Sequence, residues 1–556
     1  MEPSPKMIGI GIDGGTFKII DYLTARGRLP TMRKMMDGGV KASLISTIQP
    51  ISHTAWVSLY TGKNAGKHGI FDAVRRRKGS YELEPINGGF VEHEPLWSAF
   101  SRHGKRVCVF NVPVTYPPRP VNGFMVSGMD SPGIESAFTY PETLKGEILR
   151  AFPRYSIDLP MDAFVASHHP EPLRHMVEKI YESLEIQIGV IDYLLGREDW
   201  DFFFGIITVT DRLQHLLWPY VERKFDGAEI TDDEEQLVEG VFGAYERIDE
   251  ALSYLLEQYG SARRVMILSD HGFGPLIKDV HLNNFLADQG FLSFSPRSVW
   301  ERSATHLFTA AKKHLPGEVK QYLKKKFPNR LPYFGKLAQQ VDWDKTKIYS
   351  LGFFGNLCVN LRGREPLGIV GPGSQYESVI ENVISKLYEL RDPDDGERVV
   401  DRAYRKEELY HGEALDALPD IFLVMRNYAY MALNQFFEIE PSSVLFGKPF
   451  REMGKLSHTG SHRLEGILIF HGEDIIAGKE TETSILDVAP TILHASGLPI
   501  LKGYDGNVRS DFFAPSWREK RSIDYELHEY RWGGEFGYSE DEERDVTERL
   551  KGLGYL

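Results

Sequence analysis

The chain of 556 residues has little cysteine and no long hydrophobic run. Its two cysteines, Cys108 and Cys358, both lie in apolar stretches, which indicates buried thiols and excludes a disulfide framework. No stretch of about 20 apolar residues is present that could span a bilayer. The first residues lead directly into a short strand pattern that Asp13 interrupts, so they do not resemble a signal peptide. We therefore expect a cytoplasmic protein.

A long basic stripe is also missing. Charged residues make up 26% of the chain and the formal net charge is -14. This charge balance argues against a protein that wraps nucleic acid. It does not exclude small anionic substrates, because bound metal ions can reverse the local field.

Short apolar runs alternate along the chain with helical patterns, which favours an α/β layered fold. The apolar runs predict buried strands of a largely parallel sheet. They cover residues 8–12, 107–110, 124–126, 202–208, 265–268, 421–425 and 467–470. Helical periodicity covers residues 173–195, 233–259 and 376–390.

Residues 281–344 differ from the rest of the chain, because lysines gather there in short helical pieces that prolines separate. We expect an inserted helical cap at this position, whose lysines face either solvent or substrate. Residues 1–280 and 345–512 would then form the catalytic core. Residues 513–556 would form a C-terminal tail that ends in a short helix.

Aspartate and histidine side chains stand beside several predicted strands. In parallel α/β sheets, ligands gather at the carboxyl ends of the strands, so we expect these side chains to lie close together. Carboxylate and imidazole groups are ligands that zinc prefers, and manganese accepts them too. The six residues are Asp13, Asp211, His215, Asp270, His271 and His462.

The spacing of Asp211 and His215 supports the hypothesis of a metal site. If a helix begins near Asp211, His215 lies one turn later on the same face, and one ion could bind both. An isolated pair with this spacing is usually a solvated helix pair, and Asp13 alone could cap a helix. The metal-site hypothesis therefore depends on the whole set in this order.

A hydroxyl group near residue 52 is the candidate nucleophile. Residues 50–62 predict a loop that enters a helix, where free backbone N–H groups suit an anion. Ser52 and Thr54 could each serve only as an N-cap. A hydroxyl that binds a metal ion there could instead lose its proton near neutral pH and attack. The ligand set favours the second interpretation.

Together these segments resemble the type I phosphodiesterase/nucleotide pyrophosphatase family of the alkaline phosphatase superfamily. The resemblance implies an alkaline-phosphatase-like three-layer sandwich, with a largely parallel central sheet flanked by helices and an inserted cap. It spans most of residues 7–510 and weakens in the proposed cap. The matching segments are 11–14, 52–70, Asp211 with His215, 269–272, His462 and 487–491.

The resemblance also implies two divalent metal ions per chain, zinc first and manganese as the alternative. Asp211, His215 and His462 would hold one ion. The second ion would be bound by Asp13, Asp270, His271 and the hydroxyl of Ser52. Two such ions about 4 Å apart can bind the attacking and leaving oxygens of an in-line displacement. Ser52 would form a phosphoseryl intermediate, which water would then release.

Counting back from Thr61-Gly62 in the family pattern places the nucleophile at Ser52 rather than Thr54. His462 is preferred to His458 as a ligand, because it directly precedes the strand that starts near residue 465. Lys63 and Asn111 are candidate substrate contacts. Lys63 could equally be a solvated side chain and Asn111 a turn residue.

Several functions fit this set of residues. The first is hydrolysis of a phosphodiester or pyrophosphate in a small molecule, and the second is hydrolysis of a phosphomonoester. Phosphoryl transfer as in phosphoglycerate mutases ranks lower, because their long separate transferase domain has no match. A sulfatase lacks support, because no Cys/Ser-x-Pro-x-Arg pattern occurs at the nucleophile. A metal-stabilised binding module without turnover is the non-enzyme alternative, although no ligand or nucleophile is missing.

Overall fold

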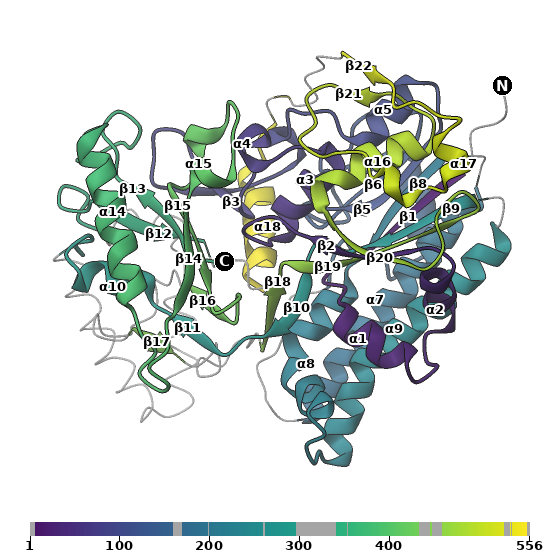
Figure 1. Ribbon diagram of the computed structural model, residues 1–556, viewed down its shortest axis with the longest axis horizontal. Helices are drawn as coiled ribbons and strands as arrows, with labels where there is room; N and C mark the ends of the chain where they lie inside the picture. The colour runs from purple at the N-terminus through teal and green to yellow at the C-terminus, as the bar shows by residue number, and fades with distance from the viewer. Residues whose placement is uncertain are drawn as a thin grey trace.

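The protein has two lobes that lie side by side (Figure 1). The larger lobe is built on a nine-stranded sheet and the smaller one, green in the figure, on a separate four-stranded sheet. The computed structural model describes residues 6–159, 170–197, 200–259, 262–295, 341–352, 354–432, 445–447, 459–527, 534 and 536–552.

The large sheet is parallel at its centre. Its strand order is β20-β2-β19-β9-β1-β8-β5-β6-β7, and the central run from β9 to β6 is parallel throughout. The strands are β1 (Lys6–Ile12), β2 (Val40–Ile45), β5 (Val107–Val112), β6 (Gly123–Ser127), β7 (Thr139–Tyr140), β8 (Phe202–Ile207), β9 (Ala262–Leu268), β19 (Glu465–Gly472) and β20 (Lys479–Ser484). The predicted fold class is therefore confirmed. The strand expected at 467–470 lies within β19, which runs antiparallel to both of its neighbours.

Helices cover both faces of this sheet, because its strands are apolar on both sides. Along β8, Phe203 and Ile207 pack into one hydrophobic cluster, whereas Phe202 and Phe204 pack into another on the opposite face. The first cluster includes α1 (Phe17–Thr24), α2 (Pro30–Asp37), α6 (Thr143–Ala151), α7 (Pro170–Leu195), α8 (Val209–Phe225) and α9 (Asp232–Gln258). The second includes α3 (Ser52–Thr61), α5 (Leu96–Arg102) and α16 (Val488–Ala495).

The smaller lobe has an antiparallel sheet of its own, ordered β12-β13-β15-β14. The strand expected at 421–425 forms, as β15, but it belongs to this sheet and not to the parallel one. A third hydrophobic cluster fills the lobe. Its elements are β11 (Lys278–Val280), α10 (Leu282–Asp288), β12 (Ile348–Leu351), β13 (Asn356–Val359), α14 (Ser374–Glu389), β14 (Val400–Arg405), α15 (Lys406–Leu409), β15 (Ile421–Met425), β16 (Tyr430–Ala432) and β17 (Phe446–Gly447).

Short elements connect the lobes. They are α4 (Ala65–His68), β3 (Val74–Arg76), β4 (Leu83–Pro85), β10 (Gly272–Pro275) and β18 (Gly460–Arg463). Three short elements near the C-terminus lie on the larger lobe instead: β21 (Ile500–Leu501), α17 (Pro515–Arg518) and β22 (Tyr525–Glu526). Most of the predicted cap, residues 296–340, lies outside the described residues, so the division into core and cap stays a prediction. Within that division, the structure places residues 348–425 in the smaller lobe and its hydrophobic cluster.

The predicted helix in the tail is confirmed as α18 (Glu540–Gly552). It is the yellow helix between the lobes in Figure 1. Its Val546 and Leu550 are buried in the cluster of the smaller lobe, and the guanidinium of Arg549 donates to the carbonyl oxygens of Met129 and Ser131. The tail therefore packs onto the body of the protein.

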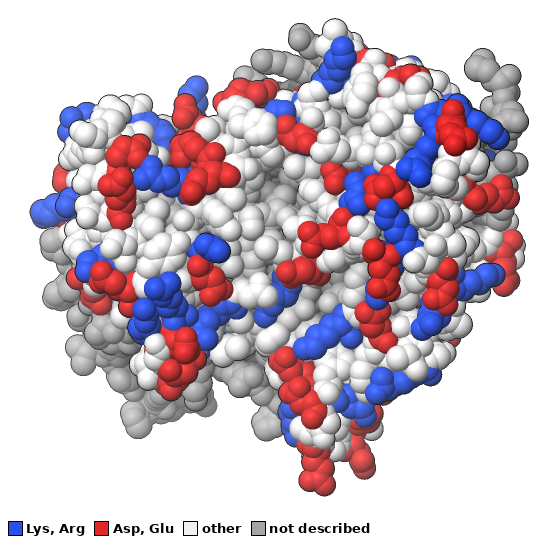
Figure 2. All heavy atoms as spheres, viewed as in Figure 1, with Lys and Arg blue, Asp and Glu red and all other residues white. Residues whose placement is uncertain are grey.

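Both cysteines are buried free thiols, as expected. Of the helices in the described part of the chain, none combines the length and the apolar character needed to cross a membrane. Figure 2 shows Lys and Arg interspersed with Asp and Glu over the visible face. The expectation that the chain does not wrap nucleic acid stays a prediction.

Candidate metal centre and nucleophile

Three neighbouring parallel strands deliver five of the six predicted ligands. Asp13 directly follows β1, and Asp270 with His271 follows β9 after one intervening residue. Asp211 and His215 lie one turn apart at the start of α8, directly after β8. Because β1 lies between β8 and β9, all five side chains meet at the carboxyl edge of the sheet.

His462 comes from a different element. The antiparallel pair of β10 and β18 places His462 opposite Phe273, two residues after His271. The rings of His271 and His462 stack with their centroids 3.6 Å apart. The pairing therefore brings a residue about 190 positions further along the chain to the edge where the other ligands lie.

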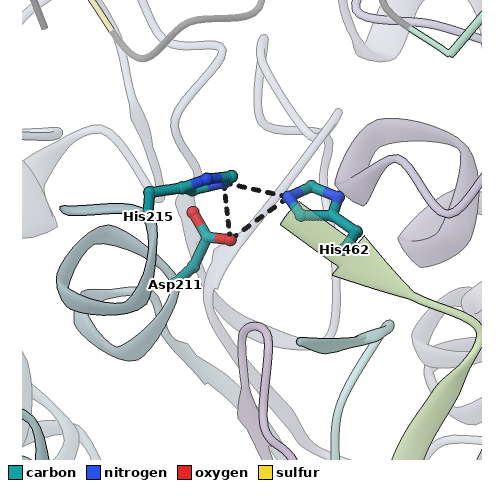
Figure 3. A group of neighbouring side chains, drawn as sticks. All are labelled: Asp211, His215 and His462. Atoms are coloured by element: carbon teal, nitrogen blue, oxygen red, sulfur yellow. Dashed lines mark hydrogen bonds and ion pairs between the residues drawn. The ribbon is translucent and has the colours of Figure 1, made fainter. Parts of the chain in front are cut away.

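The first group of ligands consists of Asp211, His215 and His462 (Figure 3). Their donor atoms all lie within 4.8 Å of one another. Nε2 of His215 lies 3.0 Å from Nε2 of His462, and these nitrogens lie 3.3 and 3.4 Å from Oδ1 of Asp211. All three side chains are buried, so these atoms converge on a point shielded from water.

The second group consists of Asp13, Asp270 and His271, and its donor atoms satisfy the same 4.8 Å limit. Nε2 of His271 lies 3.2 Å from Oδ2 of Asp270 and 3.7 Å from Oδ1 of Asp13. The stacked rings of His271 and His462 place this group directly beside the first one.

All three imidazoles are held in the same tautomer. Nδ1–H of each ring donates to a backbone carbonyl oxygen: His215 to Gly460 at 2.9 Å, His271 to Gly272 at 3.0 Å and His462 to Pro50 at 2.6 Å. A neutral ring of this kind has an unprotonated Nε2. The close pair of Nε2 atoms in the first group therefore consists of two acceptors, which a shared cation would stabilise.

Each carboxylate likewise has one oxygen that is hydrogen-bonded and one that faces the site. One oxygen of each accepts a hydrogen bond, from Arg212 for Asp211, from Trp56 for Asp13 and from the N–H of Gly14 for Asp270. The other oxygen of each is buried and has no hydrogen-bond partner among the described residues. These second oxygens face the imidazole Nε2 atoms. Buried, unpaired acceptors in this arrangement fit a divalent cation in each group.

The electrostatics of the site agree with that fit. Burial holds the pKa of His271 well below its ordinary value, which keeps the ring neutral. Burial favours the neutral form of Asp211, but the polar groups around it, among them the guanidinium of Arg212, outweigh it and hold its pKa well below the usual range. Burial and the nearby carboxylates raise the pKa of Asp13. A bound cation would offset that repulsion.

Ser52 lies at the start of α3, beside these groups. It is the first residue of the helix, and the N-cap position is Ile51, which makes no side-chain cap. The hydroxyl is therefore not used as an N-cap. Its Oγ lies 3.3 Å from Nε2 of His271, and it hydrogen-bonds to the carboxylate of Asp270. Thr54 lies two residues further along the helix.

The two predicted substrate contacts have partners outside the ligand groups, and their role toward substrate stays a prediction. Lys63 follows the C-terminal end of α3, about 15 Å from Ser52 at the rise of an α-helix, and contacts His93 Nδ1 at 3.0 Å. Asn111 lies in a bulge of β5 with φ of 57°, and its amide donates to the carbonyl oxygen of Ile206 at 3.1 Å. The alternative ligand His458 lies outside the described residues.

Trp56 and Arg212 were not anticipated from the sequence, yet both contact ligands directly. The Nε1–H of Trp56 donates to Asp13 over 3.3 Å, and Nη1 of Arg212 donates to Asp211 over 2.7 Å. Trp56 lies four residues after Ser52, so helical spacing puts both on one face of α3 and could have indicated it. Arg212 adjoins Asp211 in sequence, but adjacency on a helix does not indicate a contact.

An α/β sandwich with two carboxylate–imidazole groups at the carboxyl edge of its sheet fits a hydrolase that acts on phosphoric esters. Comparison with known proteins gives the family. Residues 7–435 match the sequence profile described as "Type I phosphodiesterase / nucleotide pyrophosphatase". The chain belongs to this family and is an enzyme that hydrolyses phosphoric ester bonds.

Several solved structures are similar to the chain at low sequence identity, and one of them has a TM-score above 0.5. Phosphonoacetate hydrolase from Sinorhizobium meliloti 1021, in complex with phosphonoformate, is 13% identical with a TM-score of 0.53, over 89% of this chain and 96% of that one. Human ectonucleotide pyrophosphatase/phosphodiesterase 5 is 13% identical with a TM-score of 0.49, over 91% and 99% of the two chains. An inactive variant of the murine protein, in complex with AMP, is 13% identical with a TM-score of 0.48, over 92% and 100%. No curated protein sequence matches the chain significantly.

Proposed function

We propose that this enzyme hydrolyses phosphodiester or pyrophosphate bonds in small molecules with Ser52 as the nucleophile and two divalent cations as cofactors. The observation that carries the proposal is the position of the Ser52 hydroxyl, 3.3 Å from Nε2 of His271 and beside two groups of buried acceptor atoms. The family to which the chain belongs supports the reaction class.

Asp211, His215 and His462 would hold one cation, and Asp13, Asp270 and His271 with the Ser52 hydroxyl would hold the other. Zinc is the first choice, because each group offers carboxylate and imidazole donors, and manganese is the alternative. When bound, two divalent cations would supply positive charge to the attacking and leaving oxygens and make the hydroxyl easier to deprotonate.

The chain itself positions the reactants. The hydrogen bond to Asp270 orients the Ser52 hydroxyl. Ala55 N–H donates back to Ile51 O at 2.8 Å, so the turn before it is the start of the helix. Amide groups and the helix dipole at such a start favour the negatively charged phosphoryl group of a substrate. Burial of Ser52 excludes bulk water while the phosphoryl group is transferred.

Two displacements complete the reaction. In the first, a bond forms between Ser52 Oγ and phosphorus while the bond from phosphorus to the leaving oxygen breaks. In the second, the oxygen of a water molecule bonds to phosphorus and the Ser52 oxygen leaves, which restores the hydroxyl. The leaving oxygen takes up the proton that the Ser52 hydroxyl loses, and in the second displacement the attacking water supplies the proton that restores the hydroxyl.

Substrate class can be tested with synthetic esters. We expect chelated protein to lose activity and to regain it with zinc or manganese. Reloaded protein should hydrolyse bis-p-nitrophenyl phosphate with a higher kcat/KM than p-nitrophenyl phosphate. Faster turnover of the monoester would contradict the diesterase proposal and favour the phosphomonoesterase. A panel of nucleotides, dinucleotides, headgroup diesters and sugar phosphates would then narrow the natural substrate.

Two further outcomes would change the class of function. Transfer of the phosphoryl group within a phosphorylated substrate, without release of phosphate, would favour the mutase-like alternative. Metal binding without turnover of any ester would favour the binding module. The cytoplasmic location expected from the sequence stays a prediction, which fractionation of the producing cells would test.

A further inference from the structure

Arg212 is a buried cation beside the first ligand group, and its guanidinium bridges two carboxylates. Nη1 donates to Oδ2 of Asp211 over 2.7 Å, and Nη2 donates to Oδ2 of Asp158 over 3.1 Å. The exposed fractions of the three side chains are 4%, 0% and 4% for Arg212, Asp211 and Asp158. Charge-assisted hydrogen bonds shielded from water to this degree are among the stronger ones in proteins.

Asp158 is itself held in place from two directions. Its Oδ1 accepts from the N–H of Leu159 at 2.8 Å, which leaves Oδ2 for Arg212. Ile157 and Leu159 on either side are buried in the hydrophobic cluster that α8 also joins. Asp158 therefore offers Arg212 a fixed anchor that lies more than 50 residues away in sequence.

The consequence for Asp211 is a choice between its two oxygens. Arg212 binds Oδ2, so Oδ1 faces Nε2 of His215 at 3.3 Å and Nε2 of His462 at 3.4 Å. Asp13 and Asp270 are oriented in the same way by Trp56 and by the N–H of Gly14, which are neutral donors. The first group is thus the one whose carboxylate is oriented by a charged side chain.

The charges around this contact balance. An isolated guanidinium beside a metal ligand would repel a cation and weaken its binding. The carboxylate of Asp158 offsets that charge at the far side of the guanidinium. The pair can therefore fix Asp211 while adding no net charge to the site.

We propose that Arg212, anchored by Asp158, is a positioning residue that presents Oδ1 of Asp211 to the cation held with His215 and His462. The inference rests on the proposed function, because it presupposes a cation in that group. Partners that orient a ligand typically contribute 10–100-fold to metal affinity. Arg212 should raise the affinity for one of the two ions and leave the affinity for the other unchanged.

The test is a zinc titration of the metal-free full-length protein against a competing fluorescent chelator. We expect the wild type to bind two ions. Arg212→Gln should bind one ion with unchanged affinity and the second about 10–100-fold more weakly. Asp158→Asn should lower the affinity for the same ion to a smaller extent, because Arg212 remains but loses its anchor.

Two control variants sharpen the result. Arg223→Gln removes an exposed arginine from the same helix, where it pairs with Glu234, and should leave both affinities unchanged. Trp56→Phe removes the donor to Asp13 and should weaken the other ion. In the double variant Arg212→Gln/Trp56→Phe, the affinity for each ion should fall by the factor seen in the corresponding single variant.

The outcomes distinguish the inference from the proposal on which it rests. If Arg212→Gln and Asp158→Asn bind both ions as tightly as a wild type that binds two, the inference is wrong and the proposed function stands. Equal weakening of both ions in a folded Arg212→Gln would also overturn it. Should Arg212→Gln not fold, the Asp158→Asn result decides. A wild type that binds fewer than two ions would contradict the proposed function and this inference with it.

Discussion

At the scale of single residues, the decisive contrast lies within α3, which carries two buried serines. Ser52 lies at the helix start beside His271 and Asp270, whereas Ser58 lies six residues further along and contacts Nε2 of His68 at 2.8 Å. The two hydroxyls are alike chemically, and their surroundings differ. Only the first lies beside the two ligand groups.

Ser52→Ala is therefore expected to abolish formation of the phosphoseryl intermediate and to lower kcat/KM by at least about 10³-fold. Zinc binding should persist in the variant, because the six carboxylate and imidazole ligands remain. Steady-state kinetics and acid-quenched labelling with a phosphorus-32 substrate would measure both effects. Ser58→Ala is the matched control and should keep nearly full activity. Retention of activity in Ser52→Ala would contradict the nucleophile assignment.

Asp72 is a second residue with a measurable consequence. Its carboxyl is buried, Oδ1 accepts from Ala73 N–H at 2.7 Å, and Oδ2 has no hydrogen-bond partner among the described residues. Burial raises its pKa to about 7. The folded state therefore keeps a proton that the unfolded chain loses near pH 4. The free energy of unfolding should fall as the pH rises from about 4 to 7.

Asp72→Asn removes the contribution of this carboxyl to the pH dependence of the unfolding free energy. Relative to the wild type, the variant should gain roughly 2–3 kcal/mol of unfolding free energy between pH 5 and pH 8. Urea unfolding of both metal-free proteins at the two pH values would measure the difference. Asp37→Asn, at an exposed carboxylate, provides the control. Parallel pH profiles of Asp72→Asn and the wild type would show that Asp72 is ionised in the folded state at both pH values.

Residue types and spacing predicted that six carboxylate and imidazole side chains lie together, because strand ends in a parallel sheet converge by geometry. Their role as metal ligands stays a prediction. They did not predict Arg212 or Trp56, because their contacts depend on side-chain direction and on partners such as Asp158 that lie far away in sequence. Lys63 was expected to contact substrate, and it lies only 11 residues after Ser52 in the sequence. The length of α3 separates the two in space.

At the scale of elements, side chains of neighbouring elements pack directly against the glycines of β1. A Cβ atom on Gly11 would lie 2.6 Å from Cη2 of Trp56, and one on Gly9 would clash with the ring of Phe204. Trp56 is the residue that donates to Asp13. The glycines of β1 therefore allow a close contact that positions a predicted ligand.

Gly11→Ala should lower the free energy of unfolding by about 1–3 kcal/mol, because the core must shift to admit the methyl group. It should also lower the affinity for the zinc ion held with Asp13, because Trp56 must move. Thermal unfolding and zinc titration would measure the two effects. Gly146→Ala is the control: this exposed position in α6 has open space around it, and alanine should be neutral or slightly stabilising. An unperturbed Gly11→Ala would contradict the packing argument.

Apolar runs predicted where strands form better than which sheet they join. Both β15 and β19 were anticipated as strands, but β15 pairs in the smaller lobe and β19 runs antiparallel. A fully buried strand has the same composition in either kind of sheet. Direction and partner depend on the connections between strands, part of which passes through residues outside the described ranges.

At the scale of the whole molecule, Gln49 links the two lobes next to the nucleophile. Its Nε2 donates to the carbonyl oxygens of Phe354 and Leu423 at 3.0 and 2.9 Å and contacts Oδ1 of Asn356 at 3.2 Å. The next residue, Pro50, accepts the hydrogen bond from His462. The segment before Ser52 is thus held by the smaller lobe on one side and by a predicted metal ligand on the other.

Gln49→Glu replaces a donor with a carboxylate that faces three acceptors. We expect a loss of at least about 3 kcal/mol in the free energy of unfolding and a fall in kcat that exceeds the change in KM. Urea unfolding and steady-state kinetics would test this. Gln289→Glu, at the exposed C-cap of α10, is the control: it should leave kcat unchanged and lower the free energy of unfolding by less than about 1 kcal/mol. Full activity of a stable Gln49→Glu would show that the lobes do not position Ser52 through this residue.

The origin of His462 has a consequence for biosynthesis. Asp13 and His462 are separated by about 450 residues, yet β18 places His462 among ligands that strands β1, β8 and β9 deliver much earlier. At usual rates of translation, His462 leaves the ribosome roughly 20–90 s after Asp13. During that interval a nascent chain could present one ligand group and not the other. Capture of the ion that His462 helps to hold would thus require synthesis to pass residue 462.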